Sequence, residues 1–576
     1  MRPNVKRLRL VLVRVLVLML FVASLGGTRA YGETNTKDVI IGLPGDIKNF
    51  NIAMGFNPSW FPSTMYFSRL VTMDYGPDFA IRPDLATDWQ VSDDGLTYTF
   101  HLHKNVKWHD GKPFTSDDVK YTFEATVQNK GMALDIFSHV KSIDTPDPDT
   151  VVIHLKETFA PFLVQLAMYP RTPILPKHLY EGTDWATNPY NMKPVGTGPY
   201  KFEKSVPGQY FSFVRNDDYF GKKPAVERVI LKVLPDVNVA VAQLRSGEIQ
   251  ALNDPPPLQL EKSLAADPNI TVDEHPGPMV YFLSFNVTKP PYNNTAVRTA
   301  LAYAINREDL NQKVTQGIYK TATGTYEPSV KWAFNDQARL PDYDPKKANA
   351  MLDAAGFPVK DGTRFGLDLW ISRATELNAA QVIKEQLKQV GVDVKITQLE
   401  DGLLRKELKS RKQDAYLYGN WWGPDPSEWE QYTASTGTWN ETGYANPRVD
   451  ELFKLGLKTV DQNQRATYYK EIQEIVLKDM PRIPLFGSGP YSFAHRKDLE
   501  GWFSQQPVSY RMDMTGVHWV TQAAAPGASQ PPTATTNDAS PDGTAGTRSP
   551  VMWVVGLAAV AGILLFLRRG RGGKAS

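Results

Sequence analysis

The sequence predicts an α/β fold of more than one compact unit, held outside a membrane. Strand and helix patterns alternate through the middle of the chain. Residues of about 31 to 520 are too many for one hydrophobic core, which suggests two or three units. The two ends have compositions typical of export and of membrane anchoring.

Residues 1–30 form the predicted signal peptide. They combine an Arg/Lys-rich start with an apolar run from about Val15 to Leu25 and with small residues at Thr28 and Ala30. An uncleaved N-terminal anchor is the alternative, but the run is short for a membrane span of about 20 residues. We therefore expect the mature chain to begin near Tyr31.

The C-terminal end predicts a tether followed by an anchor. Residues 521–550 are mostly Ala, Pro, Thr, Ser and Gly, which cannot bury enough apolar surface to fold. Residues 551–567 are uncharged and apolar, just long enough for a transmembrane helix, and the basic residues 568–576 are expected in the cytoplasm. A sorting signal that is later cleaved is the alternative, although no LPxTG-like motif supports it.

Composition and motifs exclude several functions. The chain has no cysteine, hence no disulfide, no thiolate chemistry and no lipid-modified cysteine. Its net charge is +2, with basic residues concentrated at the ends, which argues against a nucleic-acid partner. No Walker loop, GxSxG, HExxH or GxGxxG motif occurs, so neither an enzyme nor a cofactor is expected.

Local patterns predict individual elements. Residues 97–103 alternate as a half-buried strand. Thr115 is a helix cap followed by Asp117 and Asp118, which favour the positive end of the helix dipole. Residues 344–356 predict a helix that begins at an Asp-Pro pair and ends at a glycine.

The section from Phe365 to Pro424 is the most informative. It predicts a strand, a helix ending at Gly391, a second strand and then a third strand, DAYLYGNWW. Strand, helix, strand implies a parallel pair with a right-handed crossover. Ligands of such sheets bind beyond the carboxyl ends of the strands, here Ser372 to Ala374 and Asn420 to Trp422.

The stretch GNWWGPDPSEW (419–429) holds three of the thirteen tryptophans. Because successive strand residues face opposite ways, Trp422 shares a face with Tyr416, Tyr418 and Asn420, whereas Trp421 lies on the other. The cluster is either a wall on which a ligand stacks, or one core tryptophan and one covering the sheet edge. Asp425 precedes a proline and is expected to cap a helix rather than to bind a ligand.

Five stretches together resemble a known family. They are SDDGLTYTFHLHKNVKWHDGKPFTSDDVKYTFE (92–124), GTGPYKF (196–202), LSFNVTKPPYNNTAVRTALAYAINREDL (283–310), YDPKKANAMLDAAGF (343–357) and the segment from NPRVDELFK to RIPLF (446–486). In this order they resemble the extracytoplasmic solute-binding proteins of peptide-type ABC importers, the family-5 group that includes dipeptide, oligopeptide and nickel binders.

The resemblance implies a periplasmic-binding-protein-like fold of type II, with hinge-joined lobes and an inserted subdomain. By this resemblance, residues 38–283 are expected to form the first lobe, with the insertion near 81–189, and residues 284–493 the second lobe. Residues 494–520 return to the first lobe. The implied function is capture of a small solute, an oligopeptide or a related molecule, by a monomer that delivers it to the ABC permease.

The chain departs from the family's pattern at one position. Dipeptide and oligopeptide binders hold the ligand's amino terminus with an aspartate in a pattern like D-x-x-D-P, and the matching residue here is Trp422. A buried ammonium needs a paired charge. Either another carboxylate replaces the aspartate, or the ligand lacks a free amine and the aromatic wall takes a sugar ring or an apolar side chain.

Candidate ligand residues come from two regions. The loop 49–61 is expected to contribute from the first lobe, and the strand ends near 373 and 422 from the second. Arg373 is a candidate partner for a ligand carboxylate, with a solvated loop arginine as the equal alternative. The predicted ligand-binding residues are Gly55, Phe56, Asn57, Trp60, Arg373, Asn420, Trp421 and Trp422.

Three other readings stay open. His101 and His103 share a strand face near His109 and Asp110 and could hold a metal ion, although a solvated face is the simpler interpretation. An exported hydrolase of peptides or glycans would need two facing carboxylates with no structural partner. A binder of oligosaccharide or metal chelate, or a receptor acting through a membrane partner, would use the same cleft.

Overall fold

A computed structural model describes residues 38–520 apart from residues 56–57, 75–78, 169–170, 277–278, 325–329, 422, 488–489, 503–511 and 513. The described residues belong to one compact unit, Met1–Val520. The predicted signal peptide, stalk, anchor and basic tail lie outside them. Within the described part, no helix is both long and apolar enough to cross a membrane.

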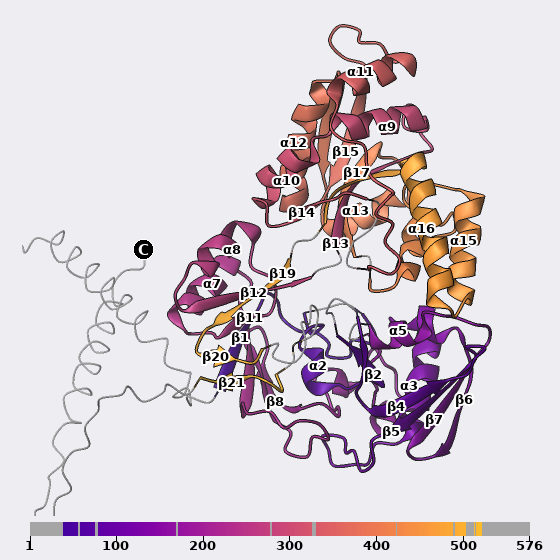
Figure 1. Ribbon diagram of the computed structural model, residues 1–576. Helices are drawn as coiled ribbons and strands as arrows, with labels where there is room; N and C mark the ends of the chain where they lie inside the picture. The colour runs from indigo at the N-terminus through magenta and orange to yellow at the C-terminus, as the bar shows by residue number, and fades with distance from the viewer. Residues whose placement is uncertain are drawn as a thin grey trace, which may run out of the picture. The chain divides into compact units, whose positions relative to one another are not determined.

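A seven-stranded sheet carries the first lobe (Figure 1). In spatial order its strands are β12 (Ile270–Pro276), β19 (Pro490–Arg496), β11 (Ala251–Leu252), β1 (Asp38–Leu43), β10 (Arg228–Val233), β9 (Tyr210–Arg215) and β8 (Tyr200–Val206). β1 runs parallel to β10 and β11, whereas β19 is antiparallel to both β12 and β11. Helices α7 (Val237–Ser246) and α8 (Leu258–Ala265) belong to this lobe.

A four-stranded antiparallel sheet belongs to the segment inserted between β1 and β8. Its order is β4 (Ala86–Val91), β5 (Thr97–Leu102), β7 (Thr150–Leu155) and β6 (Val140–Asp147). The accompanying elements are α2 (Ser63–Tyr66), β2 (Val71–Met73), β3 (Ile81–Pro83), α3 (Ser116–Gln128), α4 (Leu134–Phe137), α5 (Phe162–Ala167), α6 (Lys177–Tyr180) and η1 (Pro189–Asn191).

A six-stranded mixed sheet carries the second lobe. Its order is β14 (Lys320–Thr321), β18 (Arg482–Gly487), β13 (Met279–Phe285), β17 (Ala415–Trp421), β15 (Phe365–Ile371) and β16 (Val392–Gln398). The helices are α9 (Thr295–Ala304), α10 (Arg307–Thr315), α11 (Pro345–Ala354), α12 (Ala374–Lys388), α13 (Asp401–Leu408), η2 (Pro426–Trp429), α14 (Glu430–Thr433), α15 (Pro447–Lys458) and α16 (Gln462–Asp479). A short pair, β20 (Leu499–Glu500) and β21 (His518–Trp519), follows β19.

The chain passes between the two large sheets twice. It leaves the first sheet after β12 and enters the second at β13, and it returns from β18 to β19. Two connections of this kind are what a two-lobe protein with hinge strands requires.

The structure confirms the predicted local elements. β5 alternates between half-buried and buried residues. Thr115 caps α3, and its amide donates to Asp118 Oδ2 at 2.9 Å. Asp344 caps α11 by accepting from the Lys347 amide at 2.9 Å. β15 is parallel to both β16 and β17, as the predicted crossover requires.

The GTGPYKF motif has a steric cause. A Cβ on Gly196 would lie 1.7 Å from the carbonyl oxygen of Tyr66, and one on Gly198 would lie 2.6 Å from that of Met65. Both positions therefore require glycine, because the chain crosses α2 at backbone contact. The motif thus fixes α2, which follows the predicted ligand loop.

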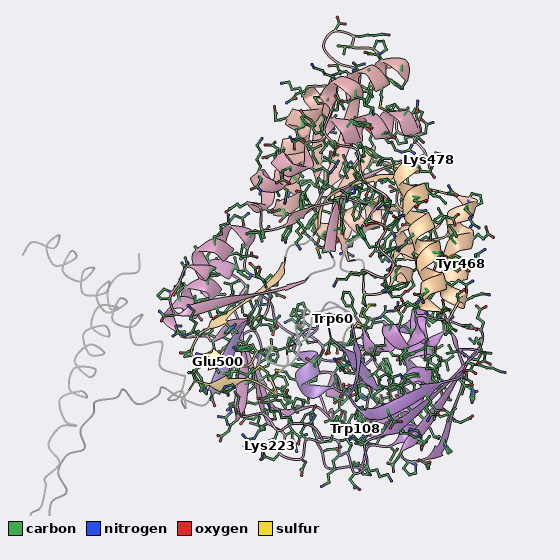
Figure 2. All side chains as sticks on the ribbon, viewed as in Figure 1. Trp60, Trp108, Lys223, Tyr468, Lys478 and Glu500 are labelled. Atoms are coloured by element: carbon green, nitrogen blue, oxygen red, sulfur yellow. The ribbon has the colours of Figure 1, made fainter. Side chains whose placement is uncertain are left out.

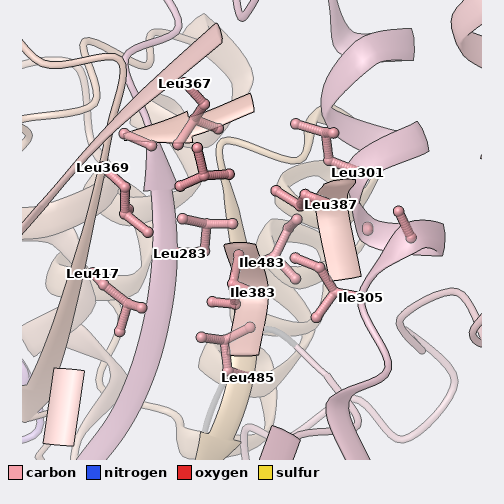
Figure 3. Packing of buried hydrophobic residues seen from close by; sticks show 14 of the residues in the cluster. Leu283, Leu301, Ile305, Leu367, Leu369, Ile383, Leu387, Leu417, Ile483 and Leu485 are labelled. Atoms are coloured by element: carbon pink, nitrogen blue, oxygen red, sulfur yellow. The ribbon is translucent and has the colours of Figure 1, made fainter. Parts of the chain in front are cut away.

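The core of the second lobe explains the two-faced pattern of β17. Figure 3 shows Leu417 packed with Leu369 of β15, Leu283 of β13 and Ile383 of α12. Ala415 is buried in the same core. The residues between them on β17 face the opposite way, so the predicted alternation is confirmed.

Asp425 has the structural role that the sequence predicts. Its carboxylate accepts from the Ser427 amide at 2.9 Å and caps η2. It also forms a bidentate pair with Arg465 of α16, at 2.7 and 3.0 Å, with both side chains almost wholly buried. Arg465 lies 5.2 Å from the centroid of the Trp332 ring. The pair therefore fastens the loop after β17 to α16.

We predict that Asp425→Ala destabilises the protein by about 3–5 kcal/mol, because it leaves a buried guanidinium without its anion. Glu451→Ala, which removes an exposed partner of Arg448 at 2.8 Å, is the matched control and should cost about 1 kcal/mol or less. Urea unfolding of both variants measures the difference. Equal, small losses would contradict the structural role of Asp425.

Candidate ligand-binding site

A cavity of about 390 Å³ is lined by residues of both lobes. Trp60, Met132 and Arg171 come from the first lobe, and Figure 2 shows Trp60 close to α2. The second lobe contributes Met279, Arg373, Arg405, Leu408, Tyr416, Tyr418, Gly419, Asn420, Tyr432, Trp439 and Glu441. The volume falls at the lower end of the usual range for small-molecule sites, which is about 300–1,000 Å³.

Three of the eight predicted ligand residues line this cavity, namely Trp60, Arg373 and Asn420. Gly55 is described but is not among its lining residues. Phe56, Asn57 and Trp422 lie outside the described residues, as does the side chain of Trp421. The ligand roles of these residues remain predictions.

Strand β17 supplies one wall of the cavity. Tyr416, Tyr418 and Asn420 alternate with the core residues Ala415 and Leu417, so their side chains project to the cavity face. The carboxyl end of β15 pairs with the start of β17, Leu369 with Ala415 and Trp370 with Tyr416, so the rest of β17 extends past the end of β15, where a ligand of a parallel pair is expected.

Two arginines converge on Tyr418. Arg373 Nη2 donates to the Tyr418 hydroxyl at 3.0 Å, Arg405 also donates to it, and both guanidiniums lie 5.1–5.2 Å from the ring centroid. Asp401 is 3.2 Å from Arg373 and 3.1 Å from Arg405. We call Arg373, Arg405, Tyr418 and Asp401 the arginine cluster. The buried Glu376, which accepts from the Arg373 amide at 2.9 Å, is a second anion beside it.

The two arginines of the arginine cluster determine the pKa of Asp401. Burial raises the pKa of Asp401, but Arg373 and Arg405 outweigh it and hold that pKa below its ordinary value. Arg373, which directly precedes α12, is paired with Asp401 and is therefore not simply a solvated loop arginine. Its side chain is nevertheless 44% exposed. Its remaining N–H groups can still donate to a ligand carboxylate in addition to Asp401.

A chain of side chains connects the lobes beside the cavity. Arg171 Nη2 donates to Gln165 Oε1 at 2.6 Å, and Gln165 Nε2 donates to Glu428 of η2. Burial raises the pKa of Glu428, and the positive charge of Arg171 only partly offsets this. We call these three residues the interlobe relay.

The histidines weighed as metal ligands have other partners. His101 Nδ1 lies 2.5 Å from Asp88 Oδ1. His109 uses both ring nitrogens on backbone, at 3.0 Å from the Gly198 oxygen and 3.1 Å from the Gly196 amide, and burial lowers its pKa to about 4. In the described ranges, no group of three or more His, Asp or Glu residues is arranged to hold a metal ion.

Sequence reasoning missed several residues of the cavity. Tyr416 and Tyr418 could have been named, since the alternation already placed them with Asn420. Arg171, Trp439 and Glu441 lie in irregular segments and Arg405 on an amphipathic helix, and nothing in their local patterns points to a cleft.

The comparisons with known proteins agree with this architecture. The family described as bacterial extracellular solute-binding proteins, family 5, matches residues 80–443. The dipeptide-binding protein of Escherichia coli is 32% identical over 78% of this chain and 90% of its own length. The chain belongs to family 5 of the solute-binding proteins.

Solved structures of other proteins support the two-lobe fold of this family-5 protein. NikZ of Campylobacter jejuni, in complex with Ni(L-His), is 27% identical with a TM-score of 0.72, covering 84% of this chain and 99% of NikZ. The oligopeptide-binding protein AppA of Bacillus subtilis, in complex with a nonapeptide, is 27% identical with a TM-score of 0.70 over 84% and 99%. The resemblance stated from sequence motifs is thereby confirmed.

We predict that Glu428→Gln raises the thermal stability of this solute-binding protein at neutral pH. The pKa of Glu428 is higher in the folded state, so the stability that it contributes is complete at low pH and is lost as the pH rises through that pKa. Glutamine removes the buried charge and can still accept from Gln165. Melting curves from pH 4 to 8 should show a gain for the variant that grows with pH. A constant difference across this range would contradict the assignment.

Proposed function

We propose that this family-5 protein captures a short peptide, or a related small solute, in the interlobe cavity and delivers it to an ABC permease in the membrane. The observation that carries the proposal is the pair of guanidiniums, Arg373 and Arg405, which line a cavity together with aromatic rings and with residues of both lobes. Rings bind apolar side chains, and paired guanidiniums bind a carboxylate.

Closure of the two lobes supplies the mechanism. Trp60, Met132 and Arg171 can reach the same ligand as β17 only when the lobes are together. A ligand that contacts both lobes therefore binds the closed form more tightly and shifts the population toward it. The closed form is the one that the permease would recognise.

A binder fits the cavity better than a hydrolase does. A glycoside hydrolase would need two carboxylates flanking the scissile bond. Glu441 is the one carboxylate residue among the described residues that line the cavity, and the nearby Asp401 is paired with two arginines. This arrangement supports binding without turnover.

We propose that both terminal segments direct this protein to the cell surface. We infer that residues 1–30 direct export and that the apolar segment 551–567 anchors the protein through residues 521–550, as a monomer. We assign residues 38–283 to the first lobe with its insertion at 81–189, residues 284–493 to the second lobe, and 494–520 to the return, which the two passages between the sheets support.

A thermal-shift screen tests the ligand class, because a ligand that binds the folded form raises the melting temperature. The purified chain is heated with di- to pentapeptides, oligosaccharides and nickel chelates. Stabilisation by peptides supports the proposal. Stabilisation by sugars or chelates alone would overturn the peptide ligand while keeping solute binding, with Trp422 as a ring platform.

We predict that Arg373→Gln weakens binding of peptides with a free carboxyl terminus by about tenfold or more, because a charge-assisted hydrogen bond is lost. Peptides with an amidated carboxyl terminus should lose much less. Calorimetric titration of both peptide forms measures this, and Arg448→Gln on exposed α15 is the control. Equal losses for both forms would contradict a carboxylate site at Arg373.

A further inference from the structure

Glu441 lies in a loop that holds it rigidly at the cavity. The preceding Asn440 donates from Nδ2 to the carbonyl oxygens of Ala434 at 2.9 Å and Tyr444 at 2.7 Å, and it accepts from the Thr442 hydroxyl at 2.8 Å. Asn440 and its three partners are all buried. Glu441 itself lines the cavity and is only 8% exposed, so its position depends on the loop rather than on solvent.

The partners of Glu441 do not fully compensate its charge. The Tyr416 hydroxyl lies 3.4 Å from Oε2, which is long for a hydroxyl that donates to a carboxylate. Arg482 and Lys409 contribute positive charge, and the backbone amide of Glu441 also donates. Burial nevertheless outweighs all of these and raises the pKa of Glu441. A further cation would therefore stabilise the ionised carboxylate.

The surroundings of Glu441 suit an ammonium group. Tyr416, Tyr432 and Trp439 line the same cavity. Aromatic rings attract a cation through their negative faces, and this attraction strengthens where water is excluded. A carboxylate among rings is thus a better partner for an amine than for a second anion or a neutral hydroxyl.

The two charged groups contact neighbouring positions, Tyr416 and Tyr418, on one face of β17. Glu441 contacts Tyr416 and the arginine cluster surrounds Tyr418, two residues further along β17. At about 3.4 Å per residue, these positions are about 7 Å apart. Two to three extended peptide residues span a similar length.

We propose that Glu441 binds the terminal ammonium of a short zwitterionic peptide whose carboxylate lies at the arginine cluster. This inference rests on the proposed peptide-binding function and names the residue that replaces the aspartate missing at Trp422. The replacement comes from the loop before α15 rather than from the end of β17. The ligand class is therefore a peptide of two or three residues with both termini free.

The test compares free and N-acetylated forms of the same tripeptide on the wild-type chain and on Glu441→Gln, by isothermal titration calorimetry of the purified full-length protein. We expect Glu441→Gln to weaken binding of the free-amine peptide by about thirtyfold or more, because a buried ammonium loses its anion. Binding of the acetylated peptide should change by less than about threefold. Glu430→Gln, a part-buried glutamate of α14 that is not among the lining residues, is the matched control and should bind like wild type.

Each outcome separates this inference from the proposed function. If the wild type binds free-amine peptides and Glu441→Gln binds them equally well, the role of Glu441 is overturned while peptide capture stands. If the wild type binds acetylated peptides as tightly as free ones, the ammonium site is overturned even where the variant fails to fold. If the wild type binds neither form, the peptide ligand itself is wrong.

The pH dependence provides an independent readout. The titratable and charged groups facing Glu441 are Tyr416 of β17, Arg482 of β18, Lys409 after α13 and Tyr432 of α14. An ammonium lowers the pKa of Glu441 in the complex, so binding releases a proton and tightens as the pH rises through the raised pKa of the free protein. Glu441→Gln should remove this dependence. A pH profile unchanged by the substitution would overturn the inference.

Discussion

Strand β17 must satisfy two environments at once, and most of the binding site depends on this constraint. Its odd residues, Ala415 and Leu417, are fixed in the core, so its even residues are fixed at the cavity. A slip of one residue in its pairing with β13 would turn Tyr416 and Tyr418 into the core and Leu417 into the cavity. Such a slip would take the two buried hydroxyls away from their partners Glu441 and Arg373 and would expose that leucine, and this cost fixes the register of the site.

Two buried acidic residues that follow this strand, Asp425 and Glu441, differ in how well their charges are compensated. Asp425 has a bidentate arginine and a backbone amide, so its charge is compensated and it holds η2 against α16. Glu441 has a long hydroxyl contact and more distant cations. Its pKa is raised because these groups do not fully compensate the burial of its charge. A compensated buried charge is structural, whereas an under-compensated charge at a cavity is where a ligand of opposite sign is stabilised most.

The sequence was a good guide to the second lobe's parallel unit, because strands β15 and β16 and helix α12 are long and strongly periodic. It also identified Asp425 as a cap, since an Asp-Pro pair after a strand has a local physical meaning. It could not identify Glu441, Trp439 or Arg171, whose places in the cavity result from loops that tertiary contacts hold. The Asn440 side chain fixes the loop around Glu441 through carbonyls at 434 and 444, a relationship that no local pattern reveals.

The contacts between the lobes explain how a ligand can control closure. Besides the cavity residues, the contacts between the lobes include the interlobe relay, the Lys458–Glu157 pair at 2.7 Å, the Ala160 amide donating to the Leu457 carbonyl at 2.7 Å, and Lys262 Nζ donating to the Gln316 carbonyl at 3.1 Å. The ion pair is more than half exposed, so solvent screens it, and the burial of Glu428 opposes closure when its carboxylate is ionised. Reversing a two-state population from 1:99 to 99:1 takes about 5.5 kcal/mol of differential binding. Charge-assisted hydrogen bonds contribute about 1.5–3 kcal/mol each, so one at each end of a zwitterion supplies about 3–6 kcal/mol and reaches this difference at the upper end, whereas a ligand that engages a single end does not. Closure of the lobes therefore depends on the two separated charged groups as well as on the contacts between the lobes. A solute closes the lobes when its length allows both of its termini to reach these groups.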